Sequence, residues 1–298
     1  MSGPSGWTNG FIAVDWGTTN RRAYRVGADG RAGDELEDAK GILSVPSGGF
    51  PAAVAEIRAR LGDLPLLMAG MIGSNRGWKE APYVPAPAGL DDLAKGLVRV
   101  GDREVIVPGV SYAEDDRADV MRGEEVQLVG AVAEGLADPN ELVCHPGTHN
   151  KWVLLRRGMI HSFRTVMTGE LFSLLKEHSI LSDLLGGKVD TGDAFCAGVR
   201  KSLNQEALTA DLFAVRARVL LGKMKKEDAA SFASGVLIGA DVHIGLDTPT
   251  MAQITVIGRP ELTRLYAAAI KVAERDAIEV DGERCFVAGA KEIAKRIE

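Results

Sequence analysis

The sequence predicts an α/β protein built from two lobes, and two observations lead to that prediction. Short apolar runs of strand character alternate along the chain with segments of helical periodicity, as is typical of α/β folds. The pentapeptide Gly17–Arg21 (GTTNR) also returns 130 positions later as Gly147–Lys151 (GTHNK), each copy between two strand-like runs. A length of 298 residues, 46% of them hydrophobic, suffices for two separate cores.

The N-terminal part of the chain predicts a β-meander, a helix and a central strand, in that order. Residues 11–16 form a buried strand with Asp15 at its end, and the turn at 17–20 leads to an alternating strand over 21–26. Ala28–Arg31 is a hairpin signal that leads to a third strand. The next predicted elements are a helix over 51–61, with Pro51 in its first turn, and a strand over 65–70.

A long loop and an amphipathic helix come next. The loop Gly73–Gly89 carries prolines together with charged and aromatic residues, a content that favours a binding loop. Gly123 then begins a helix to about Gly135, with Glu124 and Glu125 in its first turn. Acidic residues at that place suit the helix dipole on their own. The helix runs directly into the second copy of the repeat, however, so its N-terminus can also point toward the same ligand.

The C-terminal part of the chain predicts mostly helices. Thr168–Glu170 is an N-cap pattern before a helix over 171–178. Further helices are expected at about 191–203, 207–222 and 226–241, followed by a strand over 254–258, a helix over 260–274, a strand over 285–288 and a helix over 290–297. A strand that ends in a glycine before a helix, as at Gly258, is a common arrangement at nucleotides.

The repeated turn has the chemistry of a phosphate site. Glycine lets the backbone N–H groups approach phosphate oxygens, threonine hydroxyls add donors, and Arg21 or Lys151 adds charge. Only the first copy has an acid before the glycine, Asp15, which can hold a hydrated magnesium ion; His145 stands at the matching place in the second. The alternative is two unrelated hairpin turns, because Gly, Thr and Asn are common turn residues.

Composition limits the partners. The formal net charge is −6 with a pI near 5.5, so the chain offers no basic surface for nucleic acid. Neither a signal segment nor an apolar run of membrane-spanning length is evident, so no membrane partner is expected. Three widely spaced cysteines favour reduced thiols and a cytoplasmic location. The expected partner is a small molecule, and the C-terminal helices leave room for a homodimer.

Five segments resemble the 2-dehydro-3-deoxygalactonokinase family of the acetate and sugar kinase, Hsp70 and actin superfamily. They are Asp15–Ala23 (DWGTTNRRA), Gly70–Pro87 (GMIGSNRGWKEAPYVPAP), Asp119–Gly130 (DVMRGEEVQLVG), Pro146–Val153 (PGTHNKWV) and Thr165–Leu181 (TVMTGELFSLLKEHSIL). The resemblance implies an actin-like ATPase fold of two ribonuclease H-like lobes with ATP and Mg²⁺ in an interlobe cleft. The expected N-terminal lobe is 1–122, with the C-terminal helix 290–298 as its candidate completion, and the expected C-terminal lobe is 123–289.

The resemblance also implies an activity: phosphorylation by ATP of the C6 hydroxyl of 2-dehydro-3-deoxy-D-galactonate, in galactonate breakdown. Asp15 is then the expected magnesium ligand, through water, and Gly258 is expected beside the adenine or ribose. The expected phosphate-binding residues are Gly17, Thr18 and Thr19 from the first turn and Gly147, Thr148 and Lys151 from the second. Two alternatives stay open, a kinase of another sugar acid and a non-catalytic sugar-responsive regulator.

Related sugar kinases place a general base at the start of the helix before the second turn. By that placement Glu124 is the first candidate, with Asp119 and Glu125 behind it, although the related enzymes mostly use Asp there. The candidates for binding the substrate are Arg22, Arg76, Arg122 and Arg164 for its carboxylate, and Trp78 and Tyr83 for the pocket wall. Surface ion pairs are the alternative role for each arginine, and a core position is the alternative for Trp78.

Overall fold

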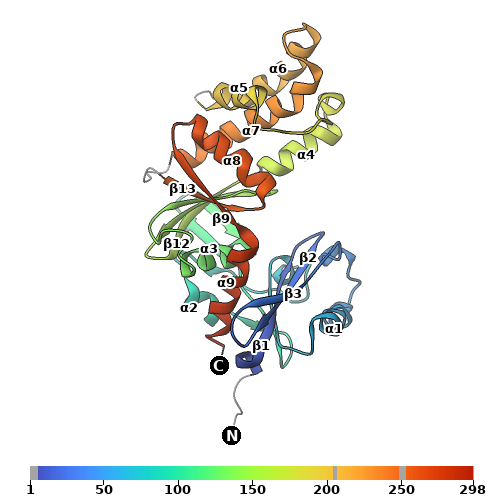
Figure 1. The fold of residues 1–298 in the computed structure, drawn as a ribbon, viewed down its shortest axis with the longest axis vertical. Helices are drawn as coiled ribbons and strands as arrows, with labels where there is room; N and C mark the ends of the chain where they lie inside the picture. The colour runs from blue at the N-terminus through green and yellow to red at the C-terminus, as the bar shows by residue number, and fades with distance from the viewer. Residues whose placement is uncertain (1–5, 204–206, 248–252, 298) are drawn as a thin grey trace. The chain divides into compact units, whose positions relative to one another are not determined.

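The computed structural model describes residues 6–203, 207–247 and 253–297, which form two units. Unit 1 is the described part of Met1–Asn140, Leu155–Ser162 and Gly282–Glu298, and unit 2 is that of Glu141–Leu154 and Phe163–Asp281. Each unit contains one main sheet and its own helices (Figure 1).

Unit 1 is built on a six-stranded sheet of order β3-β2-β1-β4-β7-β6. The strands β1, β2 and β3 pair antiparallel, whereas β1, β4 and β7 run parallel. The elements are β1 Gly10–Trp16, β2 Arg21–Gly27, β3 Ala32–Asp38, α1 Phe50–Leu61, β4 Leu66–Ala69, α2 Leu90–Lys95, β6 Val98–Arg99, β7 Glu104–Ile106, α3 Glu124–Ala133 and α9 Gly282–Ala294. A second, three-stranded sheet joins β5 Val84–Pro85, β8 Val110–Glu114 and β9 Arg117–Met121.

One face of this main sheet packs against α1. Alternate residues of β1, namely Ile12, Val14 and Trp16, are buried in one cluster with the apolar stripe Val54, Ile57 and Leu61 of α1. Pro51 lies in the first turn of α1, and Gly62 follows its last residue at a φ of 101°. The meander, the helix and the central strand therefore form where the sequence predicts them.

Unit 2 repeats the strand order of unit 1. Its five-stranded sheet has the order β12-β11-β10-β13-β14, so that, as in unit 1, the first strand stands between the second strand and the fourth. The first and second strands pair antiparallel, and the first and fourth pair parallel, in both sheets. The elements of this sheet and its helices are β10 Leu142–His145, β11 Asn150–Arg156, β12 Met159–Val166, α4 Thr168–His178, α5 Asp193–Ser202, α6 Leu208–Leu220, α7 Ala229–Leu246, β13 Gln253–Gly258, α8 Pro260–Val272 and β14 Asp276–Asp281. The end of β11 and the start of β12 fall in the segment Leu155–Ser162 of unit 1.

Helix α7 forms the centre of the helical part of unit 2. It contacts α4, α5, α6 and α8, and Figure 1 shows it among these helices. The segment Lys226–Leu246 is long and apolar enough to cross a membrane by length and composition, but 78% of its most apolar window is buried inside the protein. Burial by its own neighbours explains the hydropathy of α7, because a core helix passes the same test.

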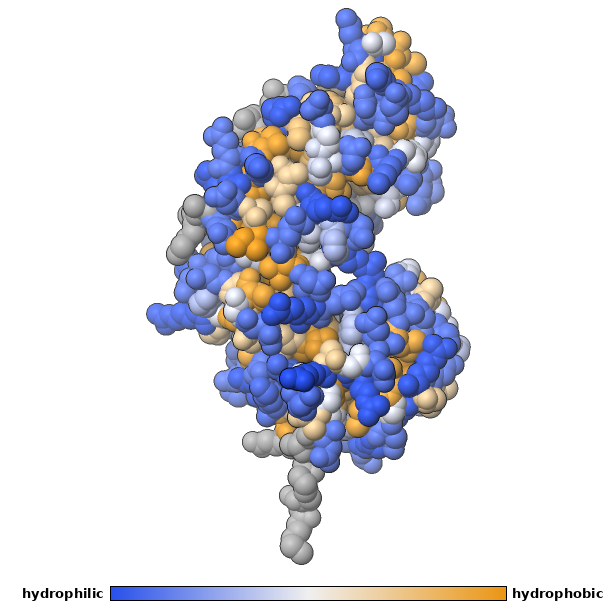
Figure 2. All heavy atoms as spheres, viewed as in Figure 1, coloured by the Kyte–Doolittle hydropathy of each residue, from blue (hydrophilic) through white to orange (hydrophobic). Residues whose placement is uncertain are grey.

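Polar residues dominate one face of the protein. On the face shown in Figure 2, hydrophilic residues cover most of the area and hydrophobic residues occur in separate groups. The larger exposed apolar side chains include Phe213 and Leu220 of α6 and Leu221, the residue that follows this helix. Most other large apolar side chains are buried in the cores of the two units.

The end of the chain corrects the sequence prediction. The expected strand at 285–288 and the helix at 290–297 form one helix, α9, and the last strand, β14, lies before it. Gly289 does not end a strand; a Cβ atom there would lie 2.0 Å from the carbonyl oxygen of Val126, and one at Gly130 would lie 2.0 Å from that of Cys285. The two glycines therefore let α9 pack closely on α3, a contact between distant segments that a local pattern does not reveal.

The same contact places α3 in unit 1. Helix α3 packs against α9 there, and the chain first passes into unit 2 at Glu141. The lobe boundary after residue 122 stays a prediction. All of α9 belongs to unit 1, a longer segment than the expected 290–298. Residues 1–5, 204–206, 248–252 and 298 of the expected ranges lie outside the described residues.

Candidate functional site

The first repeated turn, residues 17–20, joins β1 to β2 in unit 1. Three of its carbonyl oxygens accept backbone hydrogen bonds from the segment 41–43. Gly41 donates to Thr19 at 2.9 Å, Ile42 to Gly17 at 3.0 Å and Leu43 to Thr18 at 3.2 Å. Within the described ranges, no protein group accepts a hydrogen bond from the N–H of Thr18 or Thr19, and both residues are exposed. The turn therefore has backbone donors that are not used within the protein, while its backbone carbonyls are, as suits an anion site.

Gly41 supports this turn, a role that the sequence does not predict. A Cβ atom at Gly41 would lie 2.3 Å from the carbonyl oxygen of Thr18, so any side chain there would push the turn away. The indole N–H of Trp16 donates to the carbonyl of Lys40 at 3.0 Å and ties the same segment to β1. Nothing in the sequence around Gly41 signals this role, because the contact joins residues that are far apart in the chain.

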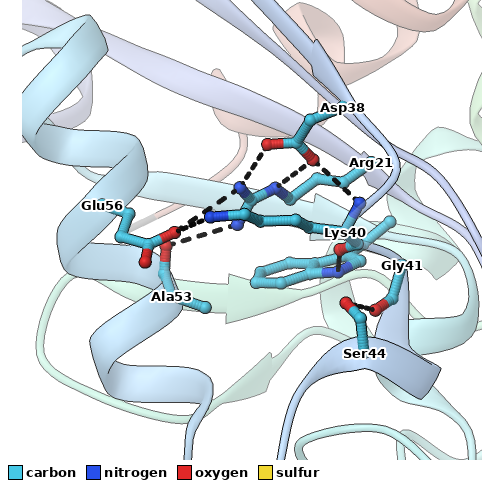
Figure 3. A network of polar contacts seen from close by, with 8 residues as sticks. Arg21, Asp38, Lys40, Gly41, Ser44, Ala53 and Glu56 are labelled. Carbon is cyan, nitrogen blue, oxygen red and sulfur yellow. Dashed lines mark hydrogen bonds and ion pairs between the residues drawn. The ribbon is translucent and has the colours of Figure 1, made fainter.

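Arg21, expected to add charge at the phosphate, has a structural role in the fold (Figure 3). Its guanidinium is 1% exposed and donates two hydrogen bonds, of 3.2 and 2.7 Å, to the carboxylate of Asp38. It also donates to the carbonyl of Ala53 at 3.4 Å and lies 5.1 Å from the ring centroid of Trp16. The charge of Arg21 is thus used to hold β2, β3 and α1 together.

Asp15 stands at the end of β1, next to this turn. It pairs with Arg22 on β2 and Ala69 on β4, and no donor among the described residues reaches its carboxylate. Burial raises the pKa of Asp15 to about 6, Arg22 opposes that rise, and the negative charges of Glu124 and Glu283 add to it. Asp15 is therefore a carboxylate whose charge a bound cation would stabilise.

Two glycines bring the start of α3 to the same place. Gly70, which follows β4 at a φ of 90°, lies so close to β1 that a Cβ atom there would be 2.9 Å from the carbonyl of Trp16 and 3.4 Å from Oδ1 of Asp15. Gly123, at a φ of 111°, packs in turn on the Cα of Gly70. Glu124, the first residue of α3, is half-buried and within electrostatic range of Asp15. Both strained positions require glycine.

Glu125 is buried beneath this site. Its side chain is fully buried, and Oε2 accepts a 2.6 Å hydrogen bond from the N–H of Gly123, whereas Oε1 has no partner among the described residues. Burial raises the pKa of Glu125 to about 8, and the neighbouring Glu124 adds to that rise. At neutral pH Glu125 is mainly protonated and out of contact with solvent, which leaves Glu124 as the accessible acid of the pair.

The raised pKa of Glu125 predicts that the protein loses stability as the pH rises. The folded state binds the proton more tightly than the unfolded state, so the stabilisation is complete below the ordinary glutamate pKa and is lost as the pH rises toward about 8. Glu125→Gln, which resembles the neutral acid, should remove this loss, worth a few kcal/mol at most. Thermal unfolding from pH 5 to 9 should show the melting temperature of the variant gaining on that of the wild type as the pH increases.

The control for this measurement is Glu35→Gln on the exposed strand β3. Its melting temperature should keep a constant offset from that of the wild type across the same pH range, because an exposed carboxylate is not desolvated on folding. If the offset of Glu125→Gln were equally constant, Glu125 would be ionised in the folded protein and this interpretation would be wrong.

Arg22 is already paired with two carboxylates. Its Nε lies 2.9 Å from Glu37 and its Nη1 lies 3.3 Å from Glu283, in the first turn of α9. Hydrogen bonding to Glu37 and the negative charges around it outweigh the effect of burial and raise the pKa of Arg22. Glu283 was not among the expected site residues, since no local pattern connects α9 with β1 and β2.

The remaining candidates of unit 1 fall into three environments. The guanidinium of Arg122 lies 4.3 Å from the ring centroid of Tyr83 and donates to the carbonyl of Ala81 at 2.8 Å, while its Nε and Nη1 have no partner among the described residues. Trp78 stacks on Phe50 at a centroid distance of 6.1 Å and packs against the core. Arg76 is exposed, and Asp119 lies half-buried on β9.

The second repeated turn, residues 146–149, joins β10 to β11 in unit 2. It rests on the start of α4, because a Cβ atom at Gly169 would lie 2.5 Å from the carbonyl of Gly147, and the N–H of Glu170 donates to the carbonyl of Thr148 at 3.0 Å. Among the described residues, no protein acceptor binds the N–H of Gly147 or Thr148. This turn is therefore supported by a glycine from below, as the first turn is by Gly41.

The side chains around the second turn are only partly available. His149 is exposed and its Nε2 lies 2.5 Å from the carboxylate of Glu170. Lys151 is 3% exposed and its Nζ donates to the carbonyl of His149 at 3.1 Å, so its charge lies beneath the turn. Gly258, at the end of β13, lies beside Pro146, and Arg164 is exposed on β12.

Comparison with known proteins identifies the family. The family model described as 2-keto-3-deoxy-galactonokinase matches residues 15–293. The 2-dehydro-3-deoxygalactonokinase of Escherichia coli (strain K12) is 42% identical over 291 residues, which cover 96% of this chain and 98% of that protein. A crystal structure from Sinorhizobium meliloti, which carries the provisional name 2-dehydro-3-deoxygalactonokinase, has a TM-score of 0.90 at 34% identity, over 96% of this chain and 98% of the other.

A more distant likeness concerns the fold alone. The activator of the 2-hydroxyisocaproyl-CoA dehydratase from Clostridium difficile, solved with bound ADPNP, has a TM-score of 0.53 at 9% identity, over 96% of this chain and 94% of that one. Together with the two sheets of matching strand order, this likeness identifies the actin-like ATPase fold. The family model matches most of the chain, so the chain belongs to the 2-keto-3-deoxy-galactonokinase family.

Proposed function

We propose that this chain transfers the γ-phosphoryl group of ATP to the C6 hydroxyl of 2-dehydro-3-deoxy-D-galactonate and forms the 6-phosphate, a step of galactonate breakdown. The observation that carries the proposal is the 42% identity to a kinase of that name over nearly the whole chain. Phosphoryl transfer needs positioning and charge neutralisation more than covalent chemistry. In this proposal the residues of the two units position the reactants and neutralise their charge.

The two turns provide the phosphate contacts. Thr18 and Thr19 in unit 1, and Gly147 and Thr148 in unit 2, offer backbone N–H groups that no described protein group accepts. Such groups bind phosphate oxygens without the cost of first breaking an internal hydrogen bond. Gly258 borders Pro146 of the second turn and is the proposed neighbour of the nucleoside.

Asp15 is the proposed magnesium ligand, and its surroundings fit that ion. Its carboxylate has no hydrogen-bond donor among the described residues, and burial raises its pKa to about 6, which supports a role in binding a cation. No group of three or more His, Cys, Asp or Glu side chains with metal-binding geometry occurs in the described part of the chain, and Mg²⁺ commonly binds through one or two carboxylates together with water and phosphate. When bound, the ion would neutralise phosphate charge.

Glu124 is the proposed general base. It is half-buried at the start of α3 and within electrostatic range of Asp15. The carboxylate accepts a 3.0 Å hydrogen bond from the N–H of Arg122, which holds it in place. An ionised carboxylate there can accept the proton of the C6 hydroxyl as the oxygen attacks the phosphorus. Asp119 is the second candidate, on β9.

Arg122 is the arginine that we favour for the substrate carboxylate. Two of its N–H-bearing atoms are buried without a partner among the described residues, an arrangement that costs free energy until an acceptor arrives. Tyr83, 39% exposed, covers one face of the guanidinium. Arg76, in the same loop as Tyr83, is the alternative, whereas Arg22 is already neutralised by Glu37 and Glu283. We further infer a cytoplasmic location, supported by the three free cysteines.

A panel of acceptors tests the proposed substrate. ADP release, coupled to NADH oxidation, should be fast with 2-dehydro-3-deoxy-D-galactonate and at least about tenfold slower with its C4 epimer, because a misplaced hydroxyl leaves a buried polar group unpaired. ³¹P NMR of the product should show a phosphate monoester coupled to the two protons at C6. The analogue without the C6 hydroxyl should give no sugar phosphate.

Galactonate, which lacks the 2-oxo group, serves as the matched acid control in this panel. Rapid turnover of galactonate or the epimer, with none of 2-dehydro-3-deoxy-D-galactonate, would show a kinase of another sugar acid. Absence of acceptor-dependent ADP release from every acid would contradict kinase activity itself.

A further inference from the structure

One buried acid in unit 2 takes no direct part in the proposed phosphoryl transfer. Asp241 lies in α7, is 1% exposed and is surrounded along that helix mainly by buried apolar residues. Burial raises the pKa of Asp241, and four side-chain hydrogen bonds oppose that rise. A carboxylate in such a position is costly unless its oxygens are satisfied, so its partners indicate what it does.

Both oxygens of Asp241 are fully used. Oδ1 accepts hydrogen bonds from Nδ2 of Asn150 at 2.9 Å and from Nε1 of Trp152 at 2.8 Å. Oδ2 accepts from the hydroxyls of Thr168 and Tyr266, each at 2.5 Å. Four donors from three different elements thus meet at one side chain, an arrangement that fixes the elements relative to one another.

Two of these donors adjoin the second repeated turn or the helix on which it rests. Asn150 is the first residue after the turn, at the start of β11. Thr168 is the first residue of α4, and the next two residues of that helix support the turn, since Gly169 packs under Gly147 and Glu170 binds the carbonyl of Thr148. Asp241 therefore binds the turn through one oxygen and its support through the other.

Neither of the other two donors is next to the turn or to Gly169 in the chain. Trp152 lies further along β11, with Gly245 of α7 packed against its indole ring. Tyr266 lies on α8, in the apolar core of the unit. The hydrogen bond from Tyr266 is the natural comparison for that from Thr168, because both are hydroxyl groups that donate to the same oxygen.

We propose that Asp241 is a positioning residue for the second phosphate turn: by binding Asn150 and Thr168 together, it holds the N–H groups of Gly147 and Thr148 in place for the phosphates of ATP. This inference rests on the proposed function, in which the turn binds ATP. It assigns no contact between Asp241 and the nucleotide. The carboxylate acts through the backbone of the turn.

The test compares three substitutions of similar size. Thr168→Val removes the hydroxyl that connects Asp241 to α4, Thr168→Ser keeps it, and Tyr266→Phe removes the other hydroxyl donor to the same oxygen. Thr168→Val should weaken the binding of a non-hydrolysable ATP analogue and raise the KM for ATP about fivefold, the effect of losing one hydrogen bond. Thr168→Ser should bind the analogue with an affinity, and have a KM for ATP, near those of the wild type.

Tyr266→Phe should lower the melting temperature about as much as Thr168→Val, yet leave analogue binding and the KM for ATP within about twofold of the wild type. Asp241→Asn should have the largest effect, at least about tenfold, because its NH₂ group faces hydrogen-bond donors. The KM for the sugar acid should be unchanged in all four variants. The three single-hydroxyl variants keep the test decisive if Asp241→Asn fails to fold.

Equal effects of Thr168→Val and Tyr266→Phe on ATP-analogue binding would overturn the inference and make Asp241 a core residue only. Analogue binding needs no acceptor, so it separates this inference from the proposed function. A wild-type protein that fails to bind the analogue would contradict ATP binding itself. Binding without phosphorylation of the expected acid would contradict the substrate alone, and the comparison of variants would still decide the role of Asp241.

Discussion

Replacing Asp15 with Asn should reduce turnover by two to three orders of magnitude and leave the fold intact. The loss has the size expected when a preorganised electrostatic group no longer acts on the transition state of phosphoryl transfer. The fold should persist because no described donor binds the Asp15 carboxylate, so Asn breaks no hydrogen bond. Removal of a charge whose pKa is already raised to about 6 by burial should leave the melting temperature equal or slightly higher.

Steady-state rates over a range of magnesium concentrations, together with thermal unfolding, measure both parts of this expectation. Asp15→Glu is the matched control because it keeps the charge and moves it by one methylene group; it should retain more activity than Asp15→Asn and need more magnesium than the wild type. Activity of Asp15→Asn within about threefold of wild type would remove Asp15 from the metal site. A large fall in melting temperature would instead give it a structural role.

The local part of the site was predictable from the sequence. Both repeated turns lie between the first and second strands of sheets with the same strand order. Apolar runs, a glycine and small polar residues specify this unit within about fifteen neighbouring residues, so a short window contains the whole signal. Asp15, Thr18 and Thr148 lie at the places that such a window predicts.

The supports of the site were not predictable in this way. Gly41 lies under Thr18, Gly169 under Gly147, and Asp241 binds Asn150 over a separation of 91 residues. Each contact depends on the tertiary fold, and none leaves a periodic pattern in the sequence. The same reason explains the error at α9, where Gly289 reads as the end of a strand until its contact with α3 is known.

Neighbouring charged residues show most clearly which features the sequence did not predict. Arg21 and Arg22 are neighbours in one motif, yet Arg21 holds β2 to α1, while Arg22 binds Glu283 of α9. Glu124 and Glu125 are likewise neighbours, but only Glu125 is fully buried. Sequence position alone could not separate the members of either pair, because adjacent residues of a strand or a helix point in different directions.

Substitution of Glu124 and of Asp119 tests which carboxylate is the general base. Glu124→Gln should lower kcat by a factor of about 10² to 10⁴, the usual range for a general base, with little change in the KM for ATP. Asp119→Asn is the matched comparison: Asp119 already accepts the N–H of Val120 at 2.8 Å, and its substitution should leave kcat within about threefold of wild type. Initial rates at saturating sugar acid and ATP measure both values.

The pH profile of kcat distinguishes a base from a residue that only shapes the site. Protonation of the base should make the wild-type kcat fall at acidic pH, and this fall should disappear in Glu124→Gln, because Gln does not ionise there. Asp119→Asn should retain it. A large loss in Asp119→Asn with a flat acidic limb, and a normal profile in Glu124→Gln, would assign the base to Asp119. Equal losses with unchanged profiles would show that neither carboxylate accepts the proton.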